Sequence, residues 1–147
     1  MSDSDLIKLY SARILALAAD IPHHGRLAGP QGTARRRSPL CGSTVTVDVV
    51  VKEGRIANFA QDVKACALGQ ASAAVLGQAV IGRSLPELQA ARDALMAMLK
   101  DGGPVPAAPF EGYEVLLPAR DYKNRHASIL LALEAVCEAM ETAQAAA

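Results

Sequence analysis

A chain of 147 residues is long enough to bury the core of one domain without disulfide staples. Fifteen lysines and arginines balance fifteen aspartates and glutamates, so no net field draws the chain to nucleic acid or to an acidic membrane, and we expect neither partner. Three widely spaced cysteines, an odd count, favour reduced thiols in a cytoplasm over a disulfide framework.

The N-terminal third of the chain predicts one helix followed by an irregular segment. The first ten residues, MSDSDLIKLY, are acidic and polar, unlike a signal peptide, and no apolar run approaches the ~20 residues of a membrane span, so we expect a cytoplasmic protein. Helical spacing after the cap candidates Asp3 and Ser4 predicts an amphipathic helix over 4–19. Glycine and proline make 20–40 irregular, although 33–38 could add an edge strand. The residues at helical spacing are Leu6, Ile7, Tyr10, Ile14 and Leu17.

A β-hairpin is predicted next. Valines alternate with other residues over 44–51, which is the period of a half-buried strand. The turn falls at 52–55, because Lys52-Glu53-Gly54-Arg55 is polar and contains glycine, and 55–63 returns as the second arm.

The remainder of the chain is mostly helical. An alanine-rich helix is predicted over 66–80, a second opens at a capping box formed by Ser84 and Glu87, and a last one covers 127–144. Between them, 102–123 reads as a non-helical, insertion-like loop, and 145–147 as a tail. We therefore expect a single α+β domain over 1–147, with a small antiparallel sheet of about three strands packed against four to five helices.

Three residues that can bind metal fall at boundaries between predicted elements. Cys41 precedes the first hairpin strand, Cys66 begins the alanine-rich helix, and His126 begins the last helix. A cysteine at a helix N-terminus is favoured as thiolate by unpaired N–H groups and the helix dipole. If the fold brings the three together, they form a Cys/Cys/His set suited to zinc or to an iron–sulfur cluster.

Each candidate also has a structural interpretation. Cys66 lies between two alanines and fits a packed core cysteine, while Cys41 fits either role. His126 beside cationic residues fits a solvated surface position. Other residues of these types are expected to have no part in the site: Cys137 in the core, His23 and His24 on the surface, and Arg35-Arg36-Arg37 on a solvated edge or a docking patch for an acidic partner.

The order of motifs resembles the iron–sulfur cluster scaffold family of IscU, SufU and the NifU N-terminal domain. The resemblance covers nearly the whole chain, and the long stretch between Cys66 and His126 is nearer to the SufU-like branch. A NifU-like fold is thereby implied. The motifs that carry the resemblance are Pro39-Leu40-Cys41-Gly42, the hairpin, Ala65-Cys66-Ala67-Leu68-Gly69-Gln70-Ala71-Ser72-Ala73, Val80-Ile81-Gly82-Arg83-Ser84-Leu85 and His126-Ala127-Ser128-Ile129-Leu130.

The resemblance implies a function and a set of ligands. Family members accept persulfide sulfur from a cysteine desulfurase, combine it with iron on their cysteines and pass the cluster to apo-proteins. By position, Cys41 and Cys66 correspond to thiolate ligands, and His126 to the histidine before the third cysteine. The resemblance implies a scaffold or carrier rather than an enzyme, with sulfurtransferase activity left open.

Two positions depart from the family pattern. Ser43 replaces the motif aspartate, and Ala127 replaces the third cysteine. At most three obvious ligands remain, with Ser43 a weak fourth, so a cluster shared by two chains of a homodimer is a further expectation. The segment 117–123 departs from the Leu-Pro-Pro-Val-Lys that IscU shows its chaperone, so that partner is not inferred.

Three functions therefore stay open at the level of sequence. The first is a scaffold or carrier that binds iron or an iron–sulfur cluster through Cys41, Cys66 and His126. The second is a zinc-dependent sulfur acceptor of the SufU type, with Cys41 or Cys66 carrying the persulfide. The third is a metal-free interaction module that kept the fold.

Overall fold

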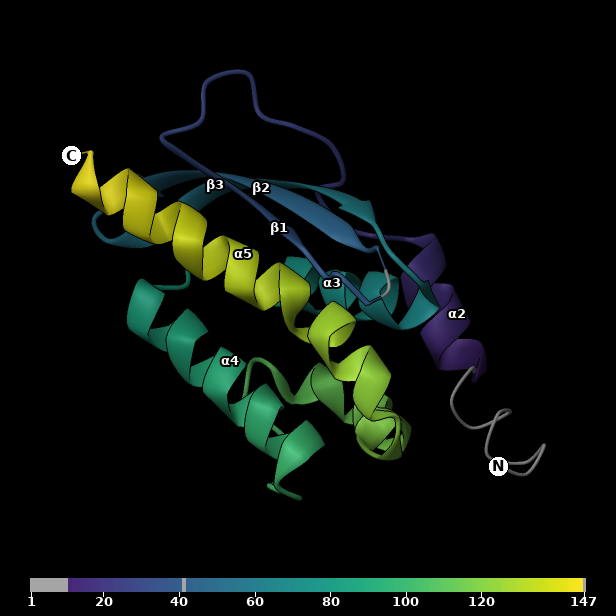
Figure 1. The fold of residues 1–147 in the computed structure, drawn as a ribbon. Helices are drawn as coiled ribbons and strands as arrows, with labels where there is room; N and C mark the ends of the chain where they lie inside the picture. Colours follow the sequence, from purple (N-terminus) through teal and green to yellow (C-terminus); the bar gives the residue numbers. More distant parts are fainter. Residues whose placement is uncertain (1–10, 41, 147) are drawn as a thin grey trace.

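The computed structural model describes residues 11–40 and 42–146. Within them the chain forms a three-stranded sheet and four α-helices, which confirms the predicted α+β class (Figure 1). In chain order the elements are α2 (Ala12–Ala19), β1 (Gly32–Arg37), β2 (Thr44–Lys52), β3 (Arg55–Lys64), α3 (Ala67–Ala79), α4 (Leu85–Lys100), the 3-10 helices η1 (Glu111–Asp121) and η2 (Lys123–Arg125), and α5 (His126–Ala145).

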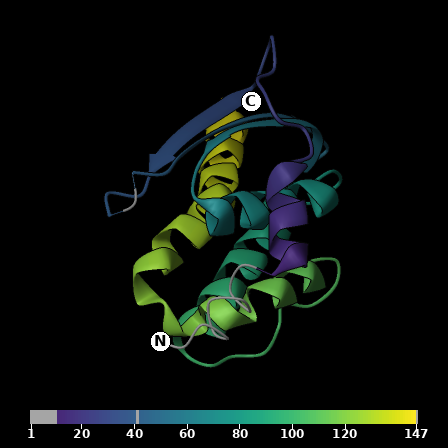
Figure 2. The same ribbon diagram turned by 90° about the vertical axis from the view of Figure 1, so that its right-hand side faces the viewer.

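The sheet is antiparallel in the order β1-β2-β3, and its two faces differ. Val45, Val47 and Val49 of β2 point to the inner face and are buried. The helices lie on this side of the sheet in both views, with α5 running beneath β1 and β2 (Figures 1 and 2). Alternate β2 residues, Thr44 and Thr46 among them, point to the outer face. This alternation confirms the predicted strand.

The predicted turn between the two longer strands is confirmed. Lys52 pairs with Arg55, and the two residues between them, Glu53 and Gly54, have φ angles of 53° and 75°. Positive φ at both central positions defines a type I′ turn, whose twist matches that of the strands. Glycine tolerates this geometry, so the turn fixes the hairpin register.

The helix ends follow the sequence signals. Ser84 and Glu87 form the capping box of α4, with each residue bonding the backbone of the other. Cys66 is the N-cap of α3, and α5 begins at His126. Cys137 is 1% exposed on the buried face of α5, which confirms the predicted core position.

Two predicted segments need correction. A continuous helix over 4–19 is wrong, because Ser11 has a non-helical backbone with φ −59° and ψ 164°, and its hydroxyl caps α2 by accepting from Ile14 N–H. The cap candidates Asp3 and Ser4 lie outside the described residues. The supposed non-helical loop 102–123 contains η1, because Tyr113 and Leu116 recur at threefold spacing and are fully buried.

The segment 20–31 is held to the outer face of the sheet by one buried carboxylate. Asp48 of β2 accepts hydrogen bonds from the Arg26 guanidinium at 2.6 Å, the Thr33 hydroxyl at 2.6 Å and the Leu27 N–H at 3.1 Å. The side chain of Asp48 is fully buried by these partners. An irregular segment thus becomes a fixed cover over the middle of the sheet.

Across residues 11–40 and 42–146, the helices are too short or too polar to span a bilayer.

Candidate metal centre

Cys66 lies at the junction of β3 and α3. Its backbone is extended, with φ −66° and ψ 169°, and its carbonyl accepts the first helical hydrogen bond from Gln70 N–H at 2.9 Å. The side chain is half-buried, unlike the fully buried Leu68 that follows in the first turn. The thiol is therefore accessible at the positive end of a helix of 13 residues.

The surroundings of Cys66 favour its thiolate. Burial raises the pKa of the Cys66 thiol, but the backbone N–H groups of Gly69 and Leu68, the Ser128 hydroxyl and the charge of Arg125 together outweigh burial. The pKa consequently lies below the ordinary value of a cysteine. Thiolate is the form that binds metal and attacks sulfur.

Two buried serines connect the start of β2 to Cys66. The Ser128 Oγ on α5 lies 3.5 Å from the Cys66 Sγ and 2.9 Å from the Ser43 Oγ. Both serine side chains are 2% exposed. Gly69 provides the room, because a Cβ atom at that position would lie 2.6 Å from the Ser128 Oγ. Three chain segments thus meet at one hydroxyl group.

The turn between β1 and β2 carries Cys41, which itself lies outside the described residues. Ser38 N–H donates to the Ser43 carbonyl and Gly42 N–H to the Ser38 carbonyl, both at 2.8 Å, so the turn is closed on either side of Cys41. Gly42 has a φ of 68°, a left-handed conformation that glycine adopts without strain. Leu40, just before Cys41, is 80% exposed.

His126 is buried rather than solvated, which corrects the surface interpretation. It is 4% exposed, and its Nε2 lies 3.0 Å from the carbonyl oxygens of both Ala119 and Arg120. Because carbonyls only accept, Nε2 carries the hydrogen, and in the neutral ring Nδ1 is the nitrogen with a free lone pair. Backbone carbonyls that fix the tautomer in this way are typical of histidines that bind metal.

A family comparison bears directly on this arrangement. A sequence model described as the NifU-like N terminal domain matches residues 9–128 of the chain. The chain belongs to the NifU-like N-terminal domain family. The match ends at Ser128, so it includes Cys41, Cys66 and His126.

Relatives of this NifU-like chain cover almost its whole length. It is 30% identical to the iron–sulfur cluster assembly scaffold protein IscU of Streptococcus pyogenes serotype M1 over 142 residues, 96% of this chain and 88% of the relative. A crystal structure of a nitrogen-fixing NifU-like protein (N-terminal) from Brucella abortus is 45% identical, with a TM-score of 0.93, and covers 97% of this chain and 99% of that one.

A more distant structure shares the fold. It is the crystal structure of an iron–sulfur cluster assembly scaffold protein for the SUF system from Fervidobacterium islandicum AW-1, with a TM-score of 0.80 at 20% identity. The alignment covers 91% of this chain and 98% of that one. The expected NifU-like fold is confirmed by both structural matches.

The fold brings some of the candidate site residues of this NifU-like chain into contact and keeps other residues of the same types apart from them. Ser43, Cys66 and Ser128 are in hydrogen-bond contact, and His126 begins the helix that carries Ser128. His23 and His24 are exposed, as expected. Within 11–40 and 42–146, no three histidine, cysteine or acidic side chains are gathered as a metal site. The Cys41/Cys66/His126 set therefore stays a prediction.

Ser128 is a site residue that was not predicted from the sequence. A serine in an apolar helix is an ambiguous signal, because serine hydroxyls also bond to their own helix. The small residue Gly69 in the first turn of α3 is the matching signal, since only a residue without a side chain leaves space for Ser128. Neither signal is readable before the two helices are placed side by side.

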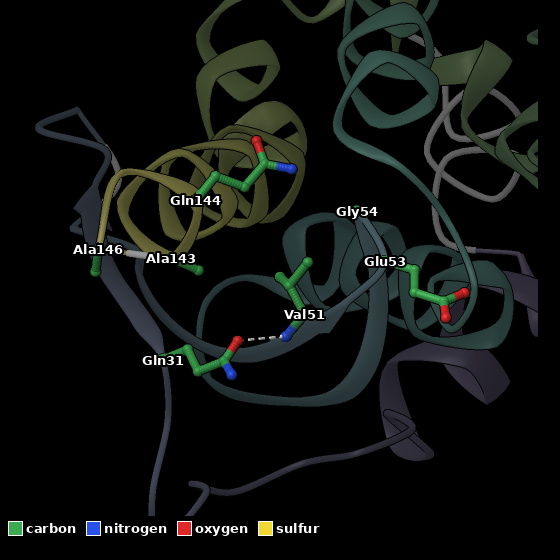
Figure 3. A pocket seen from close by; sticks show the side chains of 7 residues that line it. All are labelled: Gln31, Val51, Glu53, Gly54, Ala143, Gln144 and Ala146. Atoms are coloured by element: carbon green, nitrogen blue, oxygen red, sulfur yellow. Dashed lines mark hydrogen bonds between the residues drawn. The ribbon is translucent and has the colours of Figure 1, made fainter.

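A shallow hollow of about 380 Å³ lies at the opposite end of the sheet, between the β2–β3 turn and the end of α5 (Figure 3). Gln31 closes one side of it by accepting a hydrogen bond from Val51 N–H at 2.8 Å. Glu53 is the one ionisable residue among those that line it, so the hollow lacks the ligands of the candidate metal centre. The lining residues are Gln31, Val51, Glu53, Gly54, Ala143, Gln144 and Ala146.

Proposed function

We propose that the protein is a scaffold or carrier for iron–sulfur cluster assembly, which binds iron or a cluster through Cys41, Cys66 and His126. The observation that carries the proposal is the half-buried Cys66 thiol at the start of α3, with its pKa lowered by helix N–H groups and Ser128. Membership of the NifU-like family and the name of the Streptococcus pyogenes relative support the same role.

The three side chains have the right chemistry for this cargo. Thiolates are soft ligands for iron and sulfur, and a neutral imidazole replaces a thiolate in some clusters. In His126 the Nδ1 lone pair is the one available for iron, because Nε2 donates to the Ala119 and Arg120 carbonyls. Carbonyl anchoring would hold the ring while cargo arrives and leaves.

The three obvious ligands of the chain leave the fourth coordination position of the proposed site to another group. Ser43 stands where the family has aspartate, but its Oγ is buried against Ser128. To bind iron, the Ser43 hydroxyl would have to give up this hydrogen bond and ionise, which is unfavourable for an alcohol. Water, a partner's side chain or a second copy of the chain sharing the cluster would complete the coordination instead.

The proposed work is exchange rather than turnover of a small molecule. In the cytoplasm, a cysteine desulfurase would supply sulfur, and recipient apo-proteins would take the finished cluster. An exposed Leu40 beside Cys41 and the half-buried Cys66 are compatible with exchange, because an incoming protein can reach that turn and thiol.

A zinc-dependent sulfur acceptor is the second candidate, and the lowered pKa of Cys66 favours it. The Cys66 thiolate would attack the outer sulfur of a desulfurase persulfide, forming a new persulfide on Cys66 and releasing the desulfurase thiolate. Before the sulfur transfer, zinc would be held by the same three residues, Cys41, Cys66 and His126.

Anaerobic reconstitution with ferrous iron and sulfide tests the first proposal. Wild-type protein is expected to gain cluster absorbance with matching iron and sulfide content, and Cys41→Ala, Cys66→Ala and His126→Ala to lose most of it. Cys137→Ala is the matched control, because it also removes one thiol but lies in the core away from the site. Full loading of Cys66→Ala would contradict the assignment.

Further measurements separate the alternative functions and test the shared cluster. Stoichiometric zinc in the isolated protein, with desulfurase turnover rising when the protein is added, would support the sulfur acceptor. If the protein contains neither zinc nor iron at any occupancy, a metal-free interaction module would be supported. Light scattering during cluster loading tests the shared cluster, since a monomer at full loading excludes a bridged dimer.

A further inference from the structure

The outer face of the sheet carries a cluster of positive side chains at the end nearest Cys66. Arg37 of β1, Thr44 of β2 and Lys64 of β3 stand in one cross-strand row, and Arg35 stands opposite Thr46 in the next row. Because residues paired across strands share a face, Arg35, Arg37 and Lys64 all point away from the helices. We call these three residues the basic row.

The geometry of the basic row follows from the sheet. Arg35 and Arg37 are two residues apart on one strand, so their Cα atoms are ~7 Å apart, and Arg37 and Lys64 are separated by two strand spacings, ~10 Å. All three side chains are exposed. On the same side of the sheet the segment 20–31 is fixed over Asp48, two rows further along, and the helices lie on the opposite side (Figure 2).

The basic row is unpaired, in contrast to the neighbouring arginines. Arg36 points to the inner face and approaches Glu134 and Glu138 of α5 at 3.9 and 3.8 Å. Arg26 is paired with Asp48 at 2.6 Å. In the part of the chain that the structure describes, none of Arg35, Arg37 and Lys64 forms an ion pair.

We propose that this face is a docking surface for an acidic protein partner, whose carboxylates pair with Arg35, Arg37 and Lys64. Like charges this close repel one another, and their mutual repulsion is relieved when opposite charges bind. Each arginine can donate two parallel hydrogen bonds to one carboxylate, so binding would depend on geometry as well as on charge. The three cations make this part of the surface locally positive, although the chain as a whole carries no net charge.

The basic row lies beside the candidate metal centre. Lys64 is two residues before Cys66, and Thr44, in the middle of the row, follows Ser43 directly. A partner seated on this face would therefore reach the Cys66 end of the sheet. That such a partner delivers or receives cargo rests on the proposed function, whereas the docking itself does not.

A protein suits this surface better than a nucleic acid. Asp62 stands in the same row as Arg35 and is partly exposed, so the positive area is bounded along β3 by a carboxylate. Nucleic-acid sites commonly extend a positive stripe over many phosphates. Three cations next to a carboxylate form a small patch, which suits a folded acidic partner surface with complementary charge and shape.

The experiment is a titration of the ¹⁵N-labelled full chain, without metal, with a 12-residue peptide of alternating Glu and Thr. We expect the amide chemical-shift changes to be concentrated at the end of the sheet that contains Arg37, Thr44 and Lys64. Added salt should weaken the binding. Arg35→Gln/Arg37→Gln should weaken binding by at least about fivefold. Lys52→Gln/Lys100→Gln, which removes two exposed positive charges elsewhere on the surface, should change the affinity by less than about twofold.

Several outcomes would overturn the proposal. One is the absence of shifts at millimolar peptide, and another is equal weakening by the two double variants. Tighter binding of a twelve-residue oligothymidylate than of the acidic peptide to the same residues would assign the face to nucleic acid. Because the titration uses metal-free protein, failure of cluster loading leaves its result unchanged, and a failed titration leaves the loading experiment intact.

Discussion

The Ser43 and Ser128 hydroxyl oxygens lie 2.9 Å apart, although 85 residues separate them in the chain. Ser128 is also 3.5 Å from the Cys66 sulfur, and a hydroxyl has one hydrogen to donate. When Cys66 is a thiolate, which only accepts, Ser128 donates to it and receives from Ser43. The two serines then form a directed chain of hydrogen bonds ending on the sulfur.

Replacing Ser128 by alanine removes both hydrogen bonds of this chain, because Ser128 contacts Ser43 and Cys66. We expect Cys66 to react more slowly with iodoacetamide at neutral pH, by severalfold, because one of the groups that lowers its pKa is lost. The variant should also lose ~1–3 kcal/mol of unfolding free energy, because the buried Ser43 hydroxyl is left without its partner. Peptide mapping by mass spectrometry isolates the Cys66 rate, and urea unfolding gives the stability.

Ser72→Ala is the control for Ser128→Ala. The Ser72 hydroxyl is also buried between α3 and α5, where it donates to the Ile129 carbonyl at 2.6 Å. Its loss should lower stability with no effect on the Cys66 rate. Equal alkylation rates in the two variants would show that Ser128 does not influence the thiol.

The pH profile of alkylation should distinguish Cys66 from Cys137. Burial raises the pKa of Cys137 to about 11, with Glu141, Asp93 and Glu134 adding to the effect. The pKa of Cys66 is lowered, so its thiolate forms on the low-pH side of an ordinary cysteine, ~8.5. Cys66 should therefore reach its plateau rate in native protein while Cys137 stays unmodified, and simultaneous modification of both would contradict this order.

The helices and hairpin were predictable because their signals are local. The capping box at Ser84 and Glu87 and the positive-φ turn at Glu53 and Gly54 depend on residues within four positions of one another. The predicted start of the first helix was wrong for a local reason too, because Ser11 provides an N-cap in the middle of an otherwise continuous apolar pattern. Periodicity alone does not show which of two cap candidates is used.

The candidate site was predictable only in part. Cys66 at a helix start follows from the small-residue run after β3, but the burial of His126 does not. That burial depends on η1, whose end supplies the Ala119 and Arg120 carbonyls, and the sequence of η1 lacks the signal of an α-helix because Pro118 interrupts it. The contact between Ser43 and Ser128 depends on tertiary packing and has no local signature.

Asp48→Asn should destabilise the protein in a pH-dependent manner. Burial raises the pKa of Asp48, but hydrogen bonds from Arg26, Thr33 and Leu27 outweigh it and hold the pKa below its usual range. A carboxyl whose pKa is lowered in the folded state stabilises that state above its unfolded pKa of ~3.9, and the contribution is lost as pH falls through the folded value.

At pH 7 we expect Asp48→Asn to lose ~2–4 kcal/mol of unfolding free energy, because the amide replaces an acceptor that serves three donors. The difference from wild type should shrink as the pH falls below the unfolded pKa of ~3.9 and through the lower folded pKa, at which Asp48 in the native protein becomes protonated. Asp62→Asn, on the same face of the sheet but partly exposed, is the matched control and should change stability by less than ~0.5 kcal/mol. A pH-independent difference for Asp48→Asn would exclude the ionised carboxylate as the cause.

Ala127→Cys should restore a ligand at the position where the family has its third cysteine. Ala127 is exposed in the first turn of α5, so the substitution should cost no more than ~0.5 kcal/mol. The proposed site would then have a fourth side chain, and iron and sulfide per chain after reconstitution should rise. Ala12→Cys, an exposed position in the first turn of α2, is the control, and an equal rise in both would indicate non-specific binding.

Gly32→Ala should destabilise the sheet where β1 crosses α5. A Cβ atom at Gly32 would meet the backbone carbonyl of Ala139 and would lie 2.8 Å from the Ala143 N atom and 2.9 Å from its Cβ. Backbone atoms in the middle of a helix cannot rotate away, so β1 or α5 must shift, at a cost of ~1–3 kcal/mol or more. Gly29→Ala places the same methyl group where nothing lies within 4 Å and should be neutral or slightly stabilising. Urea midpoints of the two variants measure this difference, and equal midpoints would mean that the close contact between β1 and α5 is absent in solution.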